Sequence, residues 1–295
     1  MVERRTDWQA LGALAFGACV LGLSPILVRL AGTGPAAAGF WRLALAIPIL
    51  LFLTWRAQGR PAAPSKMALL AGLFFALDLG FWHYGIRYTS VANATVLSNL
   101  APVVVTLFAW VFLGSRPQPL FVVAVAAAVG GAWLMALAKG SPALLDQSLG
   151  DAFSVSTAFW YGLYFLCMSQ ARRTSDTGRL MLWTSLVGAP LLLAAAVVLG
   201  EPIAPATGAG WLICLGLGVM HVAGQGSVAW ALGRVSAPTA SVAMLLQPII
   251  AGALGWLLFA EAISPLQALG AAVTLGGVVL AQWVSRPLLQ APEKP

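Results

Sequence analysis

The sequence predicts an all-α polytopic membrane protein with ten transmembrane helices, built as two inverted five-helix repeats around a central cavity. The first observation is composition: 60% of the 295 residues are hydrophobic and only 8% are charged, whereas soluble domains carry about 25% charged residues. The second is a series of apolar runs of about 20 residues, the length that crosses a bilayer. The third is that one stretch of the chain occurs twice.

The repeated stretch is 90–134, which a shift of 146 positions (236 − 90) lays on 236–280. Prolines and paired glycines coincide, which is typical of a duplicated structural unit. Transporters are often built from such membrane repeats. The twelve identical pairs are Ser90/Ser236, Ala94/Ala240, Val96/Val242, Leu100/Leu246, Pro102/Pro248, Trp110/Trp256, Pro119/Pro265, Leu120/Leu266, Ala126/Ala272, Gly130/Gly276, Gly131/Gly277 and Leu134/Leu280.

Ten apolar runs are long enough to be membrane helices. Most gaps between them hold turn and helix-breaking residues, such as Gly32–Pro35, Gly59–Pro61 and Gly140–Pro142. The third and fourth runs, and the eighth and ninth, are separated by only a few residues. The runs are Trp8–Leu30, Pro35–Trp55, Met67–Tyr88, Val91–Leu113, Gln118–Ala138, Leu149–Gln170, Arg179–Leu199, Ala209–Leu232, Ala237–Phe259 and Pro265–Ser285.

Lysine and arginine positions set the orientation, because cytoplasmic loops are enriched in them. With the N-terminus inside, 12 of the 16 basic residues are cytoplasmic and 4 are not (12 + 4 = 16), namely Arg29, Arg42, Arg87 and Lys139. Asp146, Asp151, Glu201 and Glu261 lie with those four. Both termini are therefore expected in the cytoplasm, and the location expected is the bacterial cytoplasmic (inner) membrane.

The shift of 146 positions also predicts that the second copy is inverted relative to the first, because it lays the fourth run on the ninth and the fifth on the tenth. Each copy then holds five helices, an odd number, so the second enters the membrane upside down. We expect one repeat over 1–140 and an inverted one over 141–295. Inverted pairs of this kind support alternating access.

The residues of both copies resemble a known signature. Arg87–Ala94, Leu100–Pro102, Gly114 and Gly130–Gly131 are similar to an EamA-type domain, the ten-helix branch of the drug/metabolite transporter superfamily. The second copy repeats the pattern with Ser236–Ala240, Gln247–Pro248, Glu261 and Gly276–Gly277, and Phe40–Arg42 is similar too. The resemblance covers nearly the whole chain. It implies a central cavity between the halves, peripheral fifth and tenth helices, and export of small metabolites. The aromatic content is most similar to bacterial exporters of aromatic and other neutral amino acids.

Two prolines are the first candidate functional residues. Pro102 and Pro248 lie near the middle of the fourth and ninth runs, where proline removes a hydrogen bond and kinks the helix. A bare carbonyl at that depth is tolerated only against protein or a wet cavity. Asn99 and Gln247 stand beside the kinks and could face the same space. Simple packing is the alternative, since proline is common in membrane helices.

Several polar residues lie in the middle of apolar runs. Asp78 is central in the third run, with Trp82 one turn later, and His221 is central in the eighth, with Gln225 one turn later. A carboxylate at that depth is costly and is by default functional. The shift of 146 positions lays Asp78 on Gly224, so the two copies do not carry the same polar side chains at this point. The alternatives are a structural hydrogen bond for Asp78 and a satisfied core histidine for His221.

The sixth run supplies Trp160, Tyr161 and Tyr164. Aromatic side chains at this depth can stack on a ring or accept an amine, or they can simply fill the core. Arg42 and Arg87 are expected to reach the interface, or to attract a carboxylate to the mouth of the cavity. Small residues of the fifth and tenth runs allow close helix contact: Ala124, Ala128, Gly270, Gly276 and Gly277.

The leading functional hypothesis is a secondary transporter that exports a small zwitterionic metabolite by alternating access. No motif for a membrane enzyme, a nucleotide-binding loop or a metal site is present, so no cofactor and no nucleic-acid partner are expected. A channel or scaffold would not need inverted repeats. No central lysine or arginine is expected, which leaves neutral amino acids or hydrophobic amines as substrates. The sequence leaves the oligomeric state open, a monomer included.

Overall fold

A computed structural model describes residues 7–59, 62–101, 103–104, 118–138, 144–171, 175–231, 234 and 243–289. Its regular structure is entirely helical over these residues. The helices are α1 (Trp8–Gly22), α2 (Ser24–Leu30), α3 (Pro35–Ala44), α4 (Ala46–Gln58), α5 (Lys66–Tyr88), α6 (Val91–Ser98), α8 (Pro119–Leu137), α9 (Leu144–Ala171), α10 (Thr177–Val198), α11 (Gly208–Met220), the π-helix η1 (His221–Gln225), α12 (Gly226–Ala231), α14 (Leu246–Phe259) and α15 (Pro265–Leu289).

Five stretches of the described chain are long and apolar enough to cross a membrane. They are Trp8–Leu30, Pro35–Gln58, Lys66–Tyr88, Thr177–Val198 and Gly208–Ala231. Three shorter apolar helices accompany them, Pro119–Met135, Leu246–Phe259 and Pro265–Ala281. The prediction of an all-helical, multi-pass membrane protein is confirmed. Pro102 and the later part of the fourth predicted run lie outside the described residues, as does the start of the ninth.

Local sequence signals fix where several helices begin. Asp7, Ser65, Ser90 and Asp176 each accept a hydrogen bond from a backbone N–H of the following turn, which satisfies donors that a helix start leaves free. Proline occupies the first turn of α2, α3 and α8, where its missing N–H costs nothing. The gaps between the predicted runs therefore become real helix boundaries.

The outer surface of the helices is apolar. Val198 is 84% exposed, Leu212 70% and Trp133 67%. Side chains of this size would form unfavourable patches in water, whereas lipid chains solvate them. Their exposure is therefore the surface expected of a protein that is surrounded by a bilayer.

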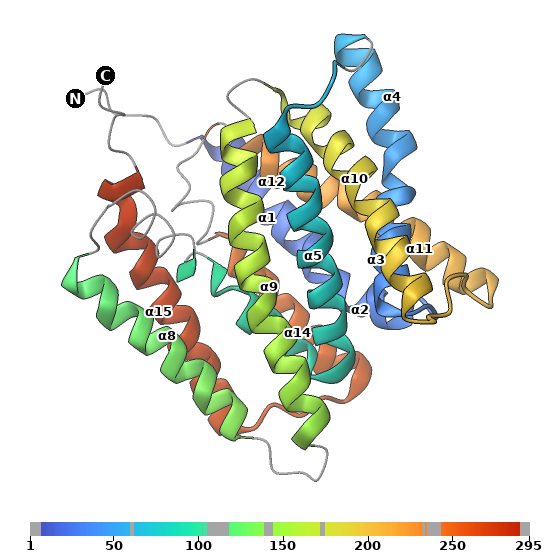
Figure 1. Cartoon of the computed structure of the whole chain (residues 1–295). Coiled ribbons are helices and arrows are strands. Elements are labelled where there is room, and N and C mark those ends of the chain that lie inside the picture. The colour runs from blue at the N-terminus through green and yellow to red at the C-terminus, as the bar shows by residue number, and fades with distance from the viewer. Residues whose placement is uncertain are drawn as a thin grey trace.

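The largest core lies among α3, α5, α9, α10 and α11. In Figure 1, α5 and α9 run side by side at the front, and the two helices contact each other along their lengths. Helix α10 packs against α3 and α5, α11 packs against α3, and α1 packs against α12. These contacts join the two halves of the sequence into one core and bring the middle of α5 next to the middle of α9.

Helices α8 and α15 form a separate pair at one side of the molecule (Figure 1). A Cβ atom on Gly131 would lie 2.6 Å from the carbonyl oxygen of Gly270, and one on Gly277 would lie 2.8 Å from that of Ala124. Gly131 comes after Ala124 in α8, but its partner Gly270 comes before Gly277 in α15. The two helices are therefore antiparallel. Their backbones approach closely where the side chains are smallest.

The adjacent repeated glycines face the other way. A Cβ atom on Gly130 or Gly276 would meet nothing within 4 Å. The expectation that Gly276 belongs to the close contact is therefore wrong. Successive residues of a helix point about 100° apart, and Gly277 and Gly131 take the contact positions.

We expect Gly131→Ala to lower the thermal unfolding midpoint of the purified protein. Its Cβ would lie 2.5 Å from the backbone nitrogen of Thr274, so the two helices must move apart, at a cost of about 1–3 kcal/mol. Gly130→Ala is the matched control and should leave the midpoint unchanged or slightly raised, because alanine favours helix. Equal midpoints for the two variants would contradict the packing described here.

Candidate functional site

Polar side chains from four helices converge in the middle of the main core. Asp78 lies near the middle of α5, and His221 and Gln225 lie in η1, within the span Gly208–Ala231. We call the whole set the central cluster; its members are Arg42, Phe75, Asp78, Trp82, Tyr161, Tyr164, His221 and Gln225. All are buried or half-buried. The sequence predicted six of these eight as site residues.

Arg42 corrects the sequence analysis, which placed it at the membrane surface and expected no central arginine. Its side chain is only 3% exposed. One guanidinium nitrogen, Nη1, donates to Ser24 Oγ at 2.9 Å, and the guanidinium carbon lies 5.9 Å from the centre of the Trp82 ring. Its charge interacts with Asp78, Tyr161 and Tyr164. The cluster therefore contains a buried cation.

Asp78 supplies the carboxyl group of the cluster and is 6% exposed. Arg42 is the opposite charge that acts on it. No direct salt bridge joins these two described side chains, and no hydrogen bond to the Asp78 carboxylate is formed within the described chain. A buried charge without a hydrogen-bonded partner is costly. Arg42 and Asp78 are therefore buried near each other without forming a closed ion pair.

Aromatic rings form one wall of the cluster. Phe75 stacks on Tyr164 with ring centres 4.7 Å apart, and Tyr161 stacks on Tyr164 at 5.9 Å. The hydroxyl groups of both tyrosines lie near the side chain of Gln225 and near Arg42 and Asp78. The stacked rings of α9 therefore border the polar groups of the cluster.

His221 and Gln225 occupy a π-helical turn, His221–Gln225. Such turns are rare and are frequent at functional sites, because the extra residue changes where side chains point. The His221 ring lies 5.5 Å from that of Phe75. These residues are repeat equivalents (221 − 146 = 75), so the matching points of the two halves meet at the cluster.

Several donors in the cluster lack partners. Among the described residues, no hydrogen-bond partner is found for Arg42 Nε, Trp82 Nε1 or either ring nitrogen of His221. Nearly all buried polar groups in folded proteins are paired. Unpaired donors around one place therefore indicate that water or a polar ligand completes them.

Other predicted site residues lie elsewhere. Trp160 packs against Phe74, Phe81 and Phe159, whereas the cluster residues Phe75 and Trp82 lie on the other flank of Asp78 in α5. Asn99 ends α6 and donates from its side-chain nitrogen to the Thr95 carbonyl at 2.7 Å.

The two residues of the ninth run also lie apart from the cluster. The Gln247 carbonyl approaches Gly22 of α1. Pro248 lines a cavity between α6, α14 and α15. This cavity, which holds about 260 Å³, is away from the central cluster.

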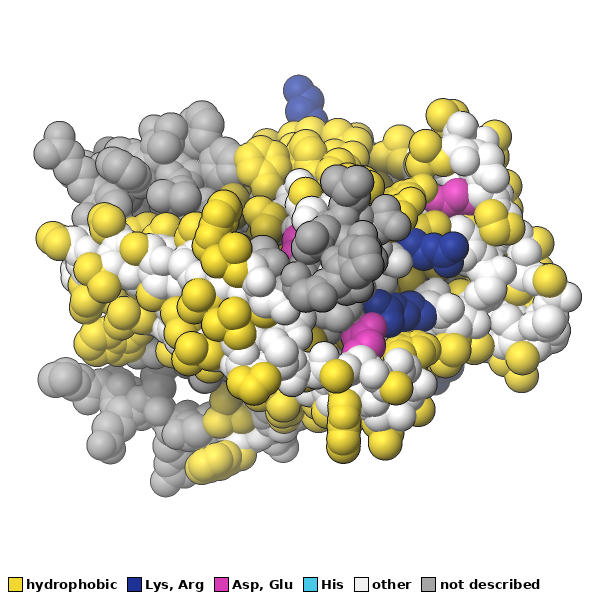
Figure 2. Space-filling view, turned by 90° about the horizontal axis from the view of Figure 1, so that it is seen from below, with side chains coloured by type: hydrophobic (Ala, Val, Ile, Leu, Met, Phe, Trp, Pro, Cys, Tyr) yellow, Lys and Arg dark blue, Asp and Glu magenta, His cyan; other side chains and the backbone are white. Residues whose placement is uncertain are grey.

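The non-cytoplasmic end predicted from the sequence carries a second set of polar contacts. Glu201 accepts from the backbone nitrogens of Ala36 and Ala37 at the start of α3, and from the Tyr84 hydroxyl. Glu261 accepts from the Val91 nitrogen at the start of α6 and forms an ion pair with Arg29. Figure 2 shows this end of the molecule, where basic and acidic side chains lie close together on a largely hydrophobic face.

Apolar helices around a buried, charged and aromatic cluster are the arrangement of a membrane protein that handles small molecules rather than of an inert scaffold. The profile of the EamA-like transporter family matches residues 9–137 and 148–283. The chain therefore belongs to the EamA-like transporter family.

The similar proteins are distant in sequence. An uncharacterized transporter of Archaeoglobus fulgidus is 25% identical over 270 residues, which cover 91% of this chain and 94% of that protein. The pseudopaline exporter CntI of Pseudomonas aeruginosa is 24% identical over 227 residues, or 75% of this chain and 77% of that protein. A solved crystal structure aligns with a TM-score of 0.65 and 18% identity, over 92% of this chain and 97% of the other. This last likeness shows the fold alone.

Proposed function

We propose that the protein exports small zwitterionic metabolites, neutral and aromatic amino acids above all, across the bacterial cytoplasmic membrane. The observation that carries this proposal is the pair of opposite charges, Arg42 and Asp78, buried together without closing into a salt bridge. A molecule with an ammonium and a carboxylate can satisfy both. The stacked rings of Phe75, Tyr161 and Tyr164 then receive its side chain.

Alternating access is the mechanism that the repeat supports. In the α8–α15 pair, Gly131 meets Gly270, and Gly277 meets Ala124. The shift of 146 exchanges these two contacts (131 + 146 = 277 and 270 − 146 = 124). A two-fold axis across an antiparallel pair lies in the membrane plane, which is the symmetry of inverted repeats. The Phe75–His221 contact is also between repeat equivalents, so the same symmetry would centre on the site.

We expect both termini in the cytoplasm, as five plus five helices require. In a background without the native cysteines, Ala206→Cys, in the loop after α10, should react with an impermeant thiol reagent added outside cells. Ala57→Cys, at the end of α4, is the matched control and should react only after permeabilisation. Both positions are exposed. The reverse labelling, or labelling of a C-terminal tag from outside, would contradict the topology.

Two other substrate classes compete with amino acids. Hydrophobic amines would use Asp78 and the aromatic wall but leave the Arg42 charge unsatisfied. The relative named a pseudopaline exporter makes pseudopaline a second candidate substrate. Uptake of labelled amino acids into inside-out vesicles of reconstituted protein tests the proposal, with amines and pseudopaline as competitors. Competition by amines alone would reject it, and absence of all transport would return a channel or enzyme to consideration.

We expect Tyr164→Ala to change the order of preference among amino acids. Losing one stacked ring should cost aromatic substrates about 1 kcal/mol, roughly fivefold in affinity, and small substrates less. Trp160→Ala is the matched control on the same helix, because Trp160 packs with Phe74 and Phe81 away from the cluster. Competition profiles of the two variants give the measurement. A changed preference in Trp160→Ala alone would move the binding wall to Trp160 and its neighbours Phe74 and Phe81.

A further inference from the structure

A cavity lies at the side of the molecule, and the proposed transport does not use it. It holds about 260 Å³ between α6, α14 and α15, with Met135 of α8 on one wall. Ile249 is 61% exposed and Ile263 is 45% exposed, so the cavity opens on the surface that faces lipid. We call it the lateral cavity. Its volume is near the lower end of ligand pockets, about 300 Å³.

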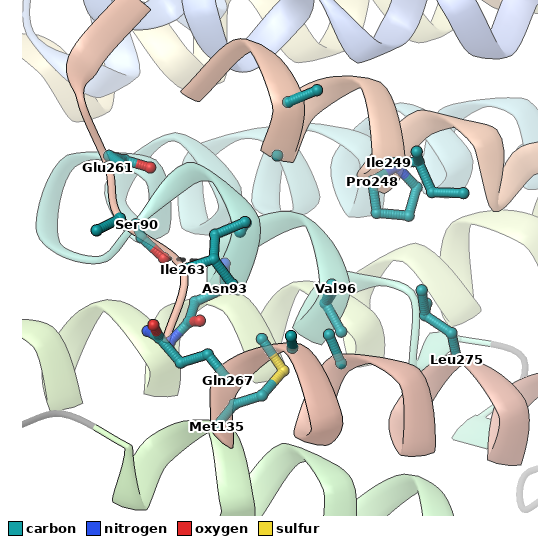
Figure 3. A pocket seen from close by; sticks show the side chains of 16 residues that line it. Ser90, Asn93, Val96, Met135, Pro248, Ile249, Glu261, Ile263, Gln267 and Leu275 are labelled. Carbon is teal, nitrogen blue, oxygen red and sulfur yellow. Dashed lines mark hydrogen bonds between the residues drawn. The ribbon is translucent and has the colours of Figure 1, made fainter. Parts of the chain in front are cut away.

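The lateral cavity is polar at one end and apolar at the other. Figure 3 shows Glu261, Ser90, Asn93 and Gln267 together at one end, and Val96, Pro248, Ile249 and Leu275 toward the other. The polar end adjoins the junction between α14 and α15, the predicted non-cytoplasmic edge of the membrane. The cavity therefore follows the change from headgroups to hydrocarbon, which is how an amphiphile lies in a bilayer.

Asn93 lines this cavity and has an unpaired polar atom beside it. Its side chain is only 1% exposed, and its Nδ2 group donates to Asp151 Oδ1 at 3.4 Å. Its carbonyl oxygen Oδ1 has no donor within the described chain. A buried carbonyl without a donor is costly. The polar end of the cavity thus needs a hydrogen-bond donor. A small shift of the Asn93 amide would bring Oδ1 to such a donor in the cavity.

The charges around the cavity decide which donor fits. Among the described residues, its lining contains the Glu261 carboxylate and no lysine or arginine. Arg29 lies on the other side of Glu261 and forms an ion pair with it. Arg29 also donates hydrogen bonds to the carbonyls of Ile86 and Thr89. Oxygen acceptors beside a carboxylate favour a cation that carries N–H groups, and they disfavour a bare phosphate.

We infer that the lateral cavity binds an amphiphile with a primary ammonium headgroup, whose chain lies along α14 and α15. Two sources share this chemistry: a phosphatidylethanolamine lipid of the membrane, and a free long-chain alkylamine. A trimethylammonium headgroup has the same charge but no N–H group, so it cannot serve Asn93 Oδ1. This inference is independent of the substrate proposed for the central cluster.

The test compares lipids that differ only in N-methylation. Purified protein in nanodiscs with phosphatidylethanolamine should unfold at a higher temperature, by roughly 3 °C, than in nanodiscs of phosphatidylcholine with the same chains. Adding decylamine to the phosphatidylcholine nanodiscs gives the second arm. A rise with lipid assigns the cavity to membrane lipid, and a rise with decylamine alone assigns it to a free amine. Equal midpoints in all three conditions would overturn the inference.

Two variants locate the effect. Ala271→Leu fills the lateral cavity, which Ala271 lines, and should abolish the difference between the lipids. Ala272→Leu is the matched control, because Ala272 is the exposed neighbour outside the lining, and should keep the difference. Asn93→Leu should also lose the difference, without needing the cavity to be filled. A difference that survives in both Ala271→Leu and Asn93→Leu would place the lipid elsewhere and reject the site.

Discussion

Replacing Arg42 with glutamine should reduce binding of amino acids on the order of 100-fold, or about 3 kcal/mol. The guanidinium is the buried cation of the central cluster, and a carboxylate brought to the middle of the membrane needs such a partner. The loss should depend on the substrate. Tyrosine should lose affinity, whereas tyramine, which has no carboxylate, should lose little. Competition for labelled amino-acid uptake by both compounds gives the measurement.

The control for Arg42→Gln is Arg87→Gln, which removes an exposed arginine of α5 and should bind both compounds normally. Removing Arg42 also leaves Asp78 without a compensating charge, which costs stability. The double variant Arg42→Gln/Asp78→Asn restores neutrality and should recover stability without recovering tyrosine binding. Equal losses for tyrosine and tyramine would show that Arg42 supports the fold rather than the carboxylate.

Asp78→Asn should produce the opposite pattern. Asparagine has the same shape but no charge, so ammonium-bearing substrates should weaken on the order of 100-fold. The acid 3-(4-hydroxyphenyl)propionate, which lacks the ammonium, should compete as well as before. Binding and the melting temperature must be measured together. A variant that melts earlier but binds every compound unchanged would make Asp78 a clamp between helices and remove it from the site.

The sequence revealed much of the central cluster because charge is expensive in apolar surroundings. Asp78 and His221 interrupt long apolar runs. An ionisable side chain at that depth is costly, so it indicates a functional or structural role. Gln225, Trp82 and the tyrosines followed from helical spacing, since residues three or four apart share a face. These inferences needed only one helix at a time.

Arg42 could not be found in that way. It is the eighth residue of its span, Pro35–Gln58, a position from which a long side chain can reach the interface. Its burial depends on Ser24 and Trp82, which other helices supply. The Phe40–Arg42 similarity to the family was the one signal available, and it did not show which way the side chain points.

Trp160 shows a second limit. Ser154 and Thr157 form a polar stripe that Tyr161 and Tyr164 continue. Trp160 borders this stripe, so the sequence alone did not separate Trp160 from Tyr161. One residue turns the side chain by about 100°, and this places Trp160 against Phe81 and Tyr161 in the cluster. The π-helical turn at His221 likewise depends on packing against neighbouring helices.

The carboxylates of Glu201 and Glu261, which bind the starts of α3 and α6, have a consequence for biosynthesis. The ribosome completes residues 1–140 while Glu201 and Glu261 are still untranslated. Until then the Ala36, Ala37 and Val91 amides, which those carboxylates bind at 3.2, 2.9 and 2.9 Å, have no permanent acceptor. The first half of the nascent chain must therefore remain in the membrane without these hydrogen bonds at the starts of α3 and α6. It reaches its final form only when the late half arrives.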